Sequence, residues 1–174
     1  MADEGRELAE ASAAGVLTLA EACEWLPSEA CEWLPSPYAT DEYSAACGQP
    51  WVAVELTGAG PSDTELAALR RALAGLPCPT LAIAPDREAP AAREAAAAFD
   101  VVVDSEAALV PLVDAVTRAP FAATALAQLL RGGDGRSIEQ GLVAESFVYS
   151  MLQAGPEFAS WLAAQPTLRP ELPE

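Results

Sequence analysis

The chain has 174 residues, 52% of them hydrophobic, and carries a formal net charge of −17 from 26 acidic residues against nine arginines, with no lysine and no histidine. Such an acidic surface repels phosphate backbones, so the composition argues against a nucleic-acid partner. Without histidine and lysine, the chain alone cannot build a Ser-His-Asp triad, a Schiff base or a histidine metal site, which leaves Asp, Glu, Cys or Tyr for acid–base work.

No apolar run approaches the roughly 18 residues that a membrane-spanning helix needs. The N-terminal sequence MADEGRELAE is acidic, whereas a secretory signal begins with basic residues. We therefore expect a cytoplasmic protein with no membrane partner. The four cysteines form no CxxC pair, so we expect free thiols and no metal site. Cys78, which lies between two prolines ahead of a strand, is expected to be buried and inert.

Residues 1–36 are predicted to form an N-terminal helical segment, because good helix formers fill Glu7–Leu26. This segment contains a perfect tandem repeat, since Glu21–Ser28 and Glu29–Ser36 both read EACEWLPS. Two interpretations stay open. The repeat is either a duplicated docking motif with a tryptophan in each copy, or a slippage duplication with no selected role.

Prolines and a glycine mark residues 37–50 as a linker ahead of a core domain over 51–164. Three short runs rich in β-branched residues are predicted strands: Trp51–Thr57, Thr80–Ala84 and Val101–Val103. Ser62 and Glu65 form a capping box that opens a helix with one leucine face, and a second helix is predicted over Pro90–Phe99. Strands that alternate with helices of this length predict βαβ units and a parallel sheet.

After residue 104 the pattern is helical throughout. Asp104 or Ser105 caps the first predicted helix, which Pro111 bends or restarts, and a second helix is predicted over Phe121–Arg131. A Ser137–Gln140 capping box opens the third, which runs to about Gln153, and a last helix starts at Pro156. Glu145 lies on a mostly apolar helix, where we expect a helix–helix or interface hydrogen bond rather than a functional acid. Residues 165–174 are proline-rich and are expected to be a tail or linker.

Three pieces of the sequence carry a family resemblance. Val54–Gly60 reads VELTGAG, Leu76–Asp104 places an Ala-rich helix between two short strands, and Ala119–Ala163 contains LLR, a glycine-rich loop, an acidic helix and PEF in that order. In this order they resemble the crotonase (enoyl-CoA hydratase/isomerase) family. The first piece is similar to a family strand that ends in LTGAG, the second to the segment that holds an oxyanion donor and the first catalytic carboxylate, and the third to the family's C-terminal helices. The resemblance implies an α/β fold: a small parallel crotonase-like ββα/βαβ sheet with a C-terminal helical bundle and an N-terminal helical extension.

The resemblance also implies candidate site residues. Crotonases bind an acyl-CoA thioester and stabilise its enolate with two backbone N–H groups, while glutamates move protons. On the family's register, the oxyanion glycine falls at Ala91, which still has an N–H, and the first catalytic glutamate falls at Glu94. Arg87 and Arg93 are candidates to bind the phosphates of CoA, because guanidinium groups suit phosphate. Surface ion pairs are the alternative for both arginines.

Two parts of the family's site are missing from the sequence. Gly60 leads directly into a capped helix, so the loop that normally supplies the first oxyanion donor is absent. Asp104 runs almost directly into the C-terminal helices, so the region of the second catalytic glutamate is absent too.

Three functional hypotheses follow. The favoured one is a reduced crotonase-like domain with lost or weak catalysis, which acts as an accessory or interaction domain for an acyl-CoA enzyme. Its partner would be a complete crotonase or a second copy of itself. The second is an active acyl-CoA hydratase, isomerase or hydrolase that uses Glu94 and the Ala91 N–H. The third is a non-catalytic CoA- or acyl-binding module, so a CoA thioester is the candidate ligand and no other cofactor is expected.

Overall fold

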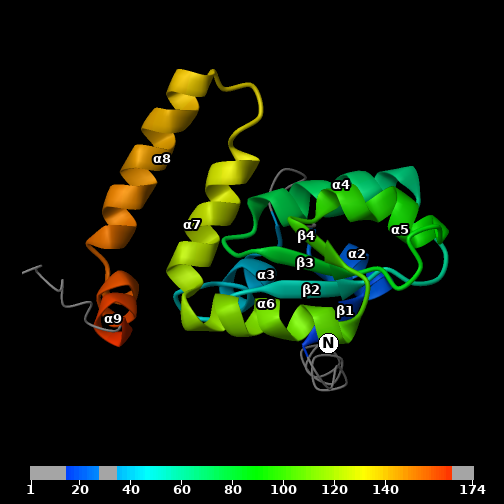
Figure 1. The fold of residues 1–174 in the computed structure, drawn as a ribbon. Helices are drawn as coiled ribbons and strands as arrows, with labels where there is room; N and C mark the ends of the chain where they lie inside the picture. Colours follow the sequence, from blue (N-terminus) through cyan, green and yellow to red (C-terminus); the bar gives the residue numbers. More distant parts are fainter. Residues whose placement is uncertain (1–14, 28–34, 166–174) are drawn as a thin grey trace, which may run out of the picture.

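The computed structural model describes residues 15–27 and 35–165 as an α/β protein built on one parallel sheet (Figure 1). The four strands lie in the order β1-β2-β3-β4 and are Val16–Thr18, Val52–Glu55, Thr80–Ile83 and Val101–Val103. Ala53 pairs with Val16 on one side and with Leu81 on the other. The predicted α/β class, the parallel sheet and the three predicted strands are confirmed, although β2 and β3 are shorter than expected.

Helices cover both faces of the sheet. On one face lie α2 (Leu19–Trp25), α4 (Asp63–Gly75) and α5 (Pro90–Ala95), which a 3₁₀ turn over Ala96–Ala98 extends. Their apolar side chains share a core with Val52 and Val54. On the other face, α6 (Glu106–Arg118) packs Leu109 against Ala53, Leu81 and Ile83. The alternation of neighbouring residues between the two cores is the period of two that a strand imposes.

The prediction of one helix over Glu7–Leu26 is wrong in the part that the structure describes. Gly15 has a positive φ of 72°, which interrupts a helix, and Val16–Thr18 then joins the sheet as β1. Thr18 caps α2 in a capping box with Glu21, so the helix begins only at Leu19. The sequence carried this signal in Thr18 and Glu21, but the uninterrupted run of helix formers concealed it.

The expectation of a loop over 37–50 is wrong for its first half. Pro37–Glu42 forms the short helix α3, in which Ala39 is buried, and Tyr43 directly after it is buried too. Both side chains belong to the core between the sheet and α2, α4 and α5. Pro37 at the first helical position favours a helix start rather than a break, and we misread it.

The remaining helices lie where the sequence predicts them. The capping boxes of Ser62 and Ser137 both form, and open α4 and α8 (Ile138–Gln153). The helix α6 continues through Pro111 without restarting. The chain then forms α7 (Pro120–Arg131), α8 and α9 (Pro156–Ala164), in which α7 contacts α8 and α8 contacts α9 (Figure 1). We call α7, α8 and α9 the helical arm.

Candidate functional site

The carboxyl ends of β2 and β3 bring Glu94 and Gly60 into contact. Gly60 follows β2, and Glu94 lies on α5 after β3; a methyl group added at Gly60 would overlap the Glu94 carboxylate. Ligands of open parallel sheets bind beyond the carboxyl ends of the strands where the strand order reverses, but the order β1-β2-β3-β4 has no reversal. The predicted glutamate therefore lies at the carboxyl ends of the strands but not at a switch point, and its side chain is exposed.

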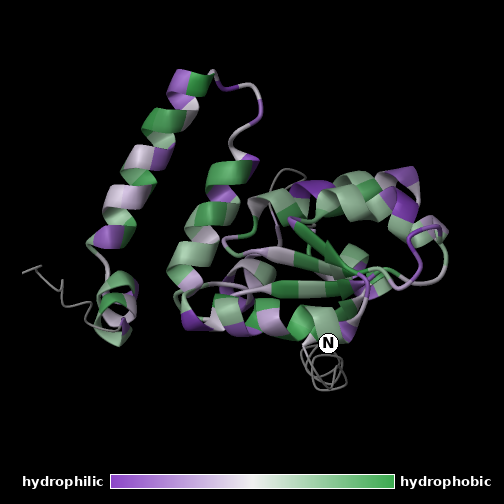
Figure 2. Cartoon of the chain, viewed as in Figure 1, coloured by the Kyte–Doolittle hydropathy of each residue, from purple (hydrophilic) through white to green (hydrophobic). Residues whose placement is uncertain are grey.

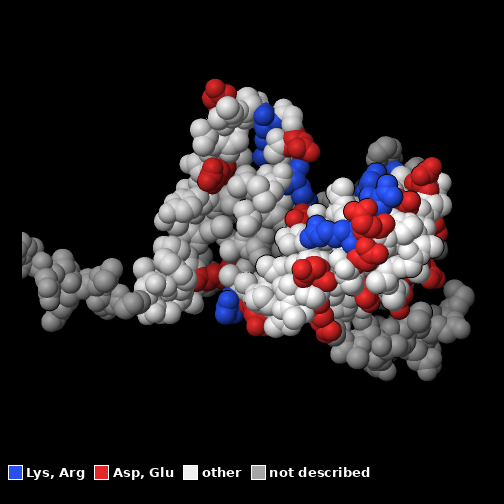
Figure 3. Space-filling model, turned by 45° about the vertical axis from the view of Figure 1, so that its right-hand side comes forward, with Lys and Arg blue, Asp and Glu red and all other residues white. Residues whose placement is uncertain are grey.

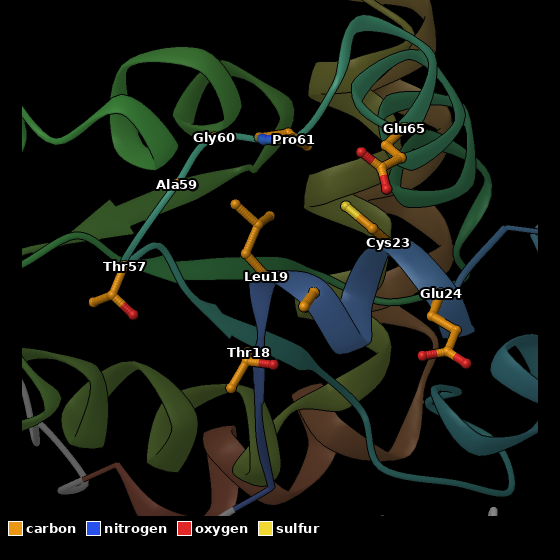
Figure 4. A pocket seen from close by; sticks show the side chains of 10 residues that line it. Thr18, Leu19, Cys23, Glu24, Thr57, Ala59, Gly60, Pro61 and Glu65 are labelled. Carbon is orange, nitrogen blue, oxygen red and sulfur yellow. The ribbon is translucent and has the colours of Figure 1, made fainter.

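Gly60 also lines an open cavity of about 740 Å³ (Figure 4). The cavity lies between the first turns of α2 and the connection from β2 to α4. Its lining residues are Thr18, Leu19, Ala20, Cys23, Glu24, Thr57, Ala59, Gly60, Pro61 and Glu65. The lining thus comes from the edge strand β1, from the helix α2 that follows it, from the connection after β2, and from the first turn of α4.

The charged groups that line this cavity are the carboxylates of Glu24 and Glu65 (Figure 4). Glu65 accepts hydrogen bonds from the Ser62 hydroxyl and N–H, which hold the pKa of its carboxyl below the usual value, so it stays ionised. Burial, and then the charge of Glu65, raise the pKa of the Cys23 thiol, which therefore stays protonated and is a poor nucleophile. An anionic ligand would meet like charge here.

None of the predicted site residues lines the cavity, and Glu94 is linked to it only through its contact with Gly60. The Ala91 side chain is fully buried in the core, and its N–H belongs to the first turn of α5, where backbone donors have no acceptor within the helix. The Arg87 guanidinium donates to the Val102 carbonyl oxygen at 3.3 Å, on the far strand β4. Arg93 is exposed on α5. Glu94 and Ala91 are thus close along one helix, whereas neither arginine lines the cavity beside Gly60.

Comparison with known proteins finds no family model, curated protein or solved structure that matches the chain. The crotonase-like relationship stays a prediction from Val54–Gly60, Leu76–Asp104 and Ala119–Ala163.

The cysteines that the structure describes, Cys23, Cys47 and Cys78, are free thiols, as predicted. Cys78 is fully buried, and burial raises its pKa to about 12, so this thiol is inert as expected. Within residues 15–27 and 35–165, no group of three His, Cys, Asp or Glu side chains could hold a metal ion.

A polar cluster at the amino ends of β3 and β4 was not predicted from the sequence. Arg131, the last residue of α7, forms a two-pronged ion pair with Asp100, and its guanidinium also donates to the carbonyl oxygens of Leu76 and Cys78 at 2.9 Å. Asp100 in turn accepts hydrogen bonds from the Thr80 N–H and hydroxyl at 2.7 and 2.9 Å. The cluster anchors the arm to the starts of β3 and β4. It is structural, because all its donors and acceptors satisfy one another.

A second carboxylate holds the arm together. Glu157 on α9 accepts hydrogen bonds from the backbone N–H groups of Phe121 and Ala122 at 2.8 and 2.9 Å. These N–H groups belong to the first turn of α7 and have no acceptor within the helix, and the carboxylate also favours the positive end of the helix dipole. Glu157 therefore replaces the side-chain cap that α7 lacks.

The helical arm is rich in apolar residues (Figure 2), and many of their side chains are exposed. Eleven large apolar side chains on it are at least half exposed: Phe121, Leu126, Leu130, Ile138, Leu142, Val143, Phe147, Tyr149, Met151, Trp161 and Leu162. No residue of α8 or α9 is buried. Single exposed apolar residues are ordinary, but a concentration of this kind marks an interaction surface.

The Glu145 carboxylate is exposed on α8, and Tyr149 one turn later is 61% exposed, so neither takes part in a buried helix–helix hydrogen bond within the chain. The interface hydrogen bond of Glu145 stays a prediction. The apolar pattern around Glu145 suggested burial, but α8 is covered on one side only.

No single helix in the described part of the chain is long and apolar enough to cross a membrane. α6 and α7 pass such a test only as a pair, and they meet at a bend of 107°.

Proposed function

We propose that this chain is a crotonase-like domain with lost or weak catalysis, and that it acts as an accessory or interaction domain for an acyl-CoA enzyme. The observation that carries the contact role is the apolar surface of the arm, with eleven large side chains at least half exposed. Soluble proteins rarely leave so much apolar surface in water. The carboxylate-rich body would keep the complex soluble while the arm supplies the contact.

The loss of catalysis is supported by the surroundings of Glu94. The connection from β2 to α4 is short and ends in the Ser62 cap, which leaves no room for a donor loop, and β4 leads into α6 after two residues. The adjacent cavity carries Glu24 and Glu65, whereas CoA carries several phosphate charges. An oxyanion site needs preorganised donors, and one exposed carboxylate does not replace them.

A working acyl-CoA enzyme is the second candidate, because Glu94 contacts Gly60 beside a cavity at the carboxyl ends of the strands. In this alternative Glu94 would move the proton and the Ala91 N–H would stabilise the enolate. A non-catalytic CoA-binding module would need the phosphates to reach Arg87 or Arg93.

The test is to titrate crotonyl-CoA and acetyl-CoA into the purified chain, following heat and thioester turnover. The proposal expects neither binding nor turnover, in the wild type or in Glu94→Gln. Turnover that disappears in Glu94→Gln but survives in Glu88→Gln, an exposed glutamate of the preceding loop, establishes the enzyme instead. Binding without turnover, weakened by Arg87→Gln or Arg93→Gln, establishes the binding module.

A further inference from the structure

The helices α8 and α9 form a hairpin on the outer side of α7 (Figure 1). We call these two helices, from Ile138 to Ala164, the α8–α9 hairpin. None of its residues is buried, and its main contacts with the rest of the chain are those between α8 and α7. The hairpin therefore contributes nothing to the two cores that hold the sheet and its helices together.

The contact between α7 and α8 is made of small residues. Partly buried residues mark it, because they recur every three or four positions along one side of each helix. On α8 they are Gly141, Ala144, Val148 and Leu152, and on the side of α7 opposite the buried Ala127 they are Ala122, Ala125 and Leu129. Four of these seven residues are glycine or alanine, so the contact buries little apolar area and stabilises the hairpin weakly.

The packing of α9 is incomplete. An open cavity of about 580 Å³ lies between α9 and the turn where α6 meets α7 at 107°. Its lining includes Arg118 and Phe121 on one side and Trp161 on the other. In the described part of the chain, the hydrogen bonds that join the hairpin to α7 are the two that Glu157 accepts. One carboxylate is therefore the polar contact that closes the hairpin.

The connection from α7 to α8 has the properties of a hinge. On its α7 side, Arg131 and Gln128 fix α7 to the sheet through hydrogen bonds to Asp100 and to the Leu76 carbonyl oxygen. Residues 132–135 then read Gly-Gly-Asp-Gly, and the last of these glycines has a positive φ of 79°. Glycines absorb backbone rotation at little steric cost. The hairpin can thus move while α7 stays in place.

We infer that the α8–α9 hairpin opens from α7 as one unit, with residues 132–135 as the hinge and the Glu157 carboxylate as the closing contact. Opening exposes the partly buried stripe of α7 and releases the N–H groups of its first turn, while Arg131 keeps α7 on the sheet. The hairpin is then an autoinhibitory cover, because this stripe becomes available for the contact role proposed above only in the open form. The opening itself does not depend on that role; only its use as a cover rests on it.

Native-state hydrogen exchange of the full chain at increasing urea concentration tests the inference. Detached helices of 16 and nine residues are marginal in water, so each opening lets their amides exchange. The amides of α8 and α9 should share one opening free energy, which should lie below that of β2 and β3, while the second half of α7 keeps the protection of the sheet. Equal protection of hairpin and sheet, different values for α8 and α9, or exchange of all of α7 with them overturns the inference.

Two glycine substitutions test the hinge as a matched pair, because an added methyl group meets no neighbouring atom at either position. Gly135→Ala forces a side chain into the positive φ of the closed hinge, so the exchange of α8 and α9 should accelerate together by about fivefold or more. Gly141→Ala favours the helix α8 and should slow this exchange. Exchange of β2 and β3 should not change in either variant. Unchanged hairpin exchange in Gly135→Ala, or acceleration in both variants, contradicts the hinge.

These readouts are separate from those of the acyl-CoA titration. Thioester turnover by a chain whose hairpin opens as described overturns the proposed function alone. A hairpin as protected as the sheet, in a chain that binds no thioester, overturns the opening alone.

Discussion

At the scale of single residues, Asp100 holds the arm to the sheet. Its two carboxylate oxygens are shared between the Arg131 guanidinium and the N–H and hydroxyl of Thr80. The Asp100 and Arg131 side chains are only 19% and 15% exposed, so water replaces these hydrogen bonds poorly. Removing one partner of such a pair leaves the other charge uncompensated.

Asp100→Asn is therefore expected to lower the free energy of unfolding by about 2–3 kcal/mol. Urea denaturation followed by circular dichroism measures this loss. Asp114→Asn removes an exposed carboxylate from α6 and should change the stability by less than about 0.5 kcal/mol. Equal effects of the two substitutions would show that the Arg131–Asp100 pair contributes nothing.

The same pair makes stability depend on pH. Burial raises the pKa of Asp100, but the hydrogen bonds from Arg131 and Thr80 outweigh burial, and the pKa lies below its ordinary value. The stabilisation is thus complete above the unfolded pKa of about 3.9 and is lost as the pH falls through the lower folded value. The difference in unfolding free energy between wild type and Asp100→Asn should be constant above about pH 5 and should shrink below pH 4. A difference that grows on acidification contradicts the assignment.

At the scale of elements, the tandem repeat looks like an insertion whose two ends meet. Pro27 and Pro35, which occupy the same position in the two copies, form an antiparallel bridge, and the Ser36 N–H donates to the Leu26 carbonyl oxygen at 2.7 Å. Residues 28–34 lie outside the described residues, and with them the second tryptophan. In the first copy Leu26 is fully buried in the core, so it cannot serve as an exposed anchor.

Deleting Glu29–Ser36 removes one copy and rejoins ends that already lie together, so the fold should survive with a change in stability below about 1 kcal/mol. Thermal unfolding measures the outcome. Deleting Glu21–Ser28 instead yields the identical sequence, so this one variant tests the loss of either copy. A loss of folding would assign the duplication a structural role, and a loss of self-association or partner binding would revive the docking motif.

Glu157 should be the main polar contact that keeps α9 on α7. Glu157→Gln replaces one carboxylate oxygen by an amide donor opposite a backbone N–H, which should weaken the cap by about 1 kcal/mol. Hydrogen exchange should accelerate over α9 and the first turn of α7, with the sheet unchanged. Glu145→Gln, an exposed change in the middle of α8, should leave the exchange of α9 unchanged. Unchanged exchange in Glu157→Gln would mean that apolar packing alone positions α9.

Local signals predicted most of these elements. The capping boxes at Ser62 and Ser137 and the valine run Val101–Val103 each have a short-range physical cause that the sequence displays. The strand β1 was missed because its three residues gain stability from pairing with β2, a partner more than thirty residues away. The polar cluster of Arg131 and Asp100 was missed for a similar reason, since nothing local indicates that these two side chains meet.

At the scale of the whole molecule, charge and apolar surface separate. The body carries most of the carboxylates, whereas the arm is poor in charge and rich in exposed apolar side chains (Figures 2 and 3). The position of Glu94 at the carboxyl edge of the sheet agrees with its place in the sequence, because it follows β3 on the next helix. The carboxylates that line the neighbouring cavity come from α2 and α4, and only the folded arrangement brings them together.

We propose that the surroundings of Glu94 do not bind an acyl-CoA. Hydrogen exchange of the whole chain, with and without millimolar crotonyl-CoA, tests it at the site itself. The account predicts equal exchange, in both conditions, for peptides that cover Thr57–Glu65 and Pro90–Ala95. Protection of both segments by the thioester, lost in Glu94→Gln, would contradict it.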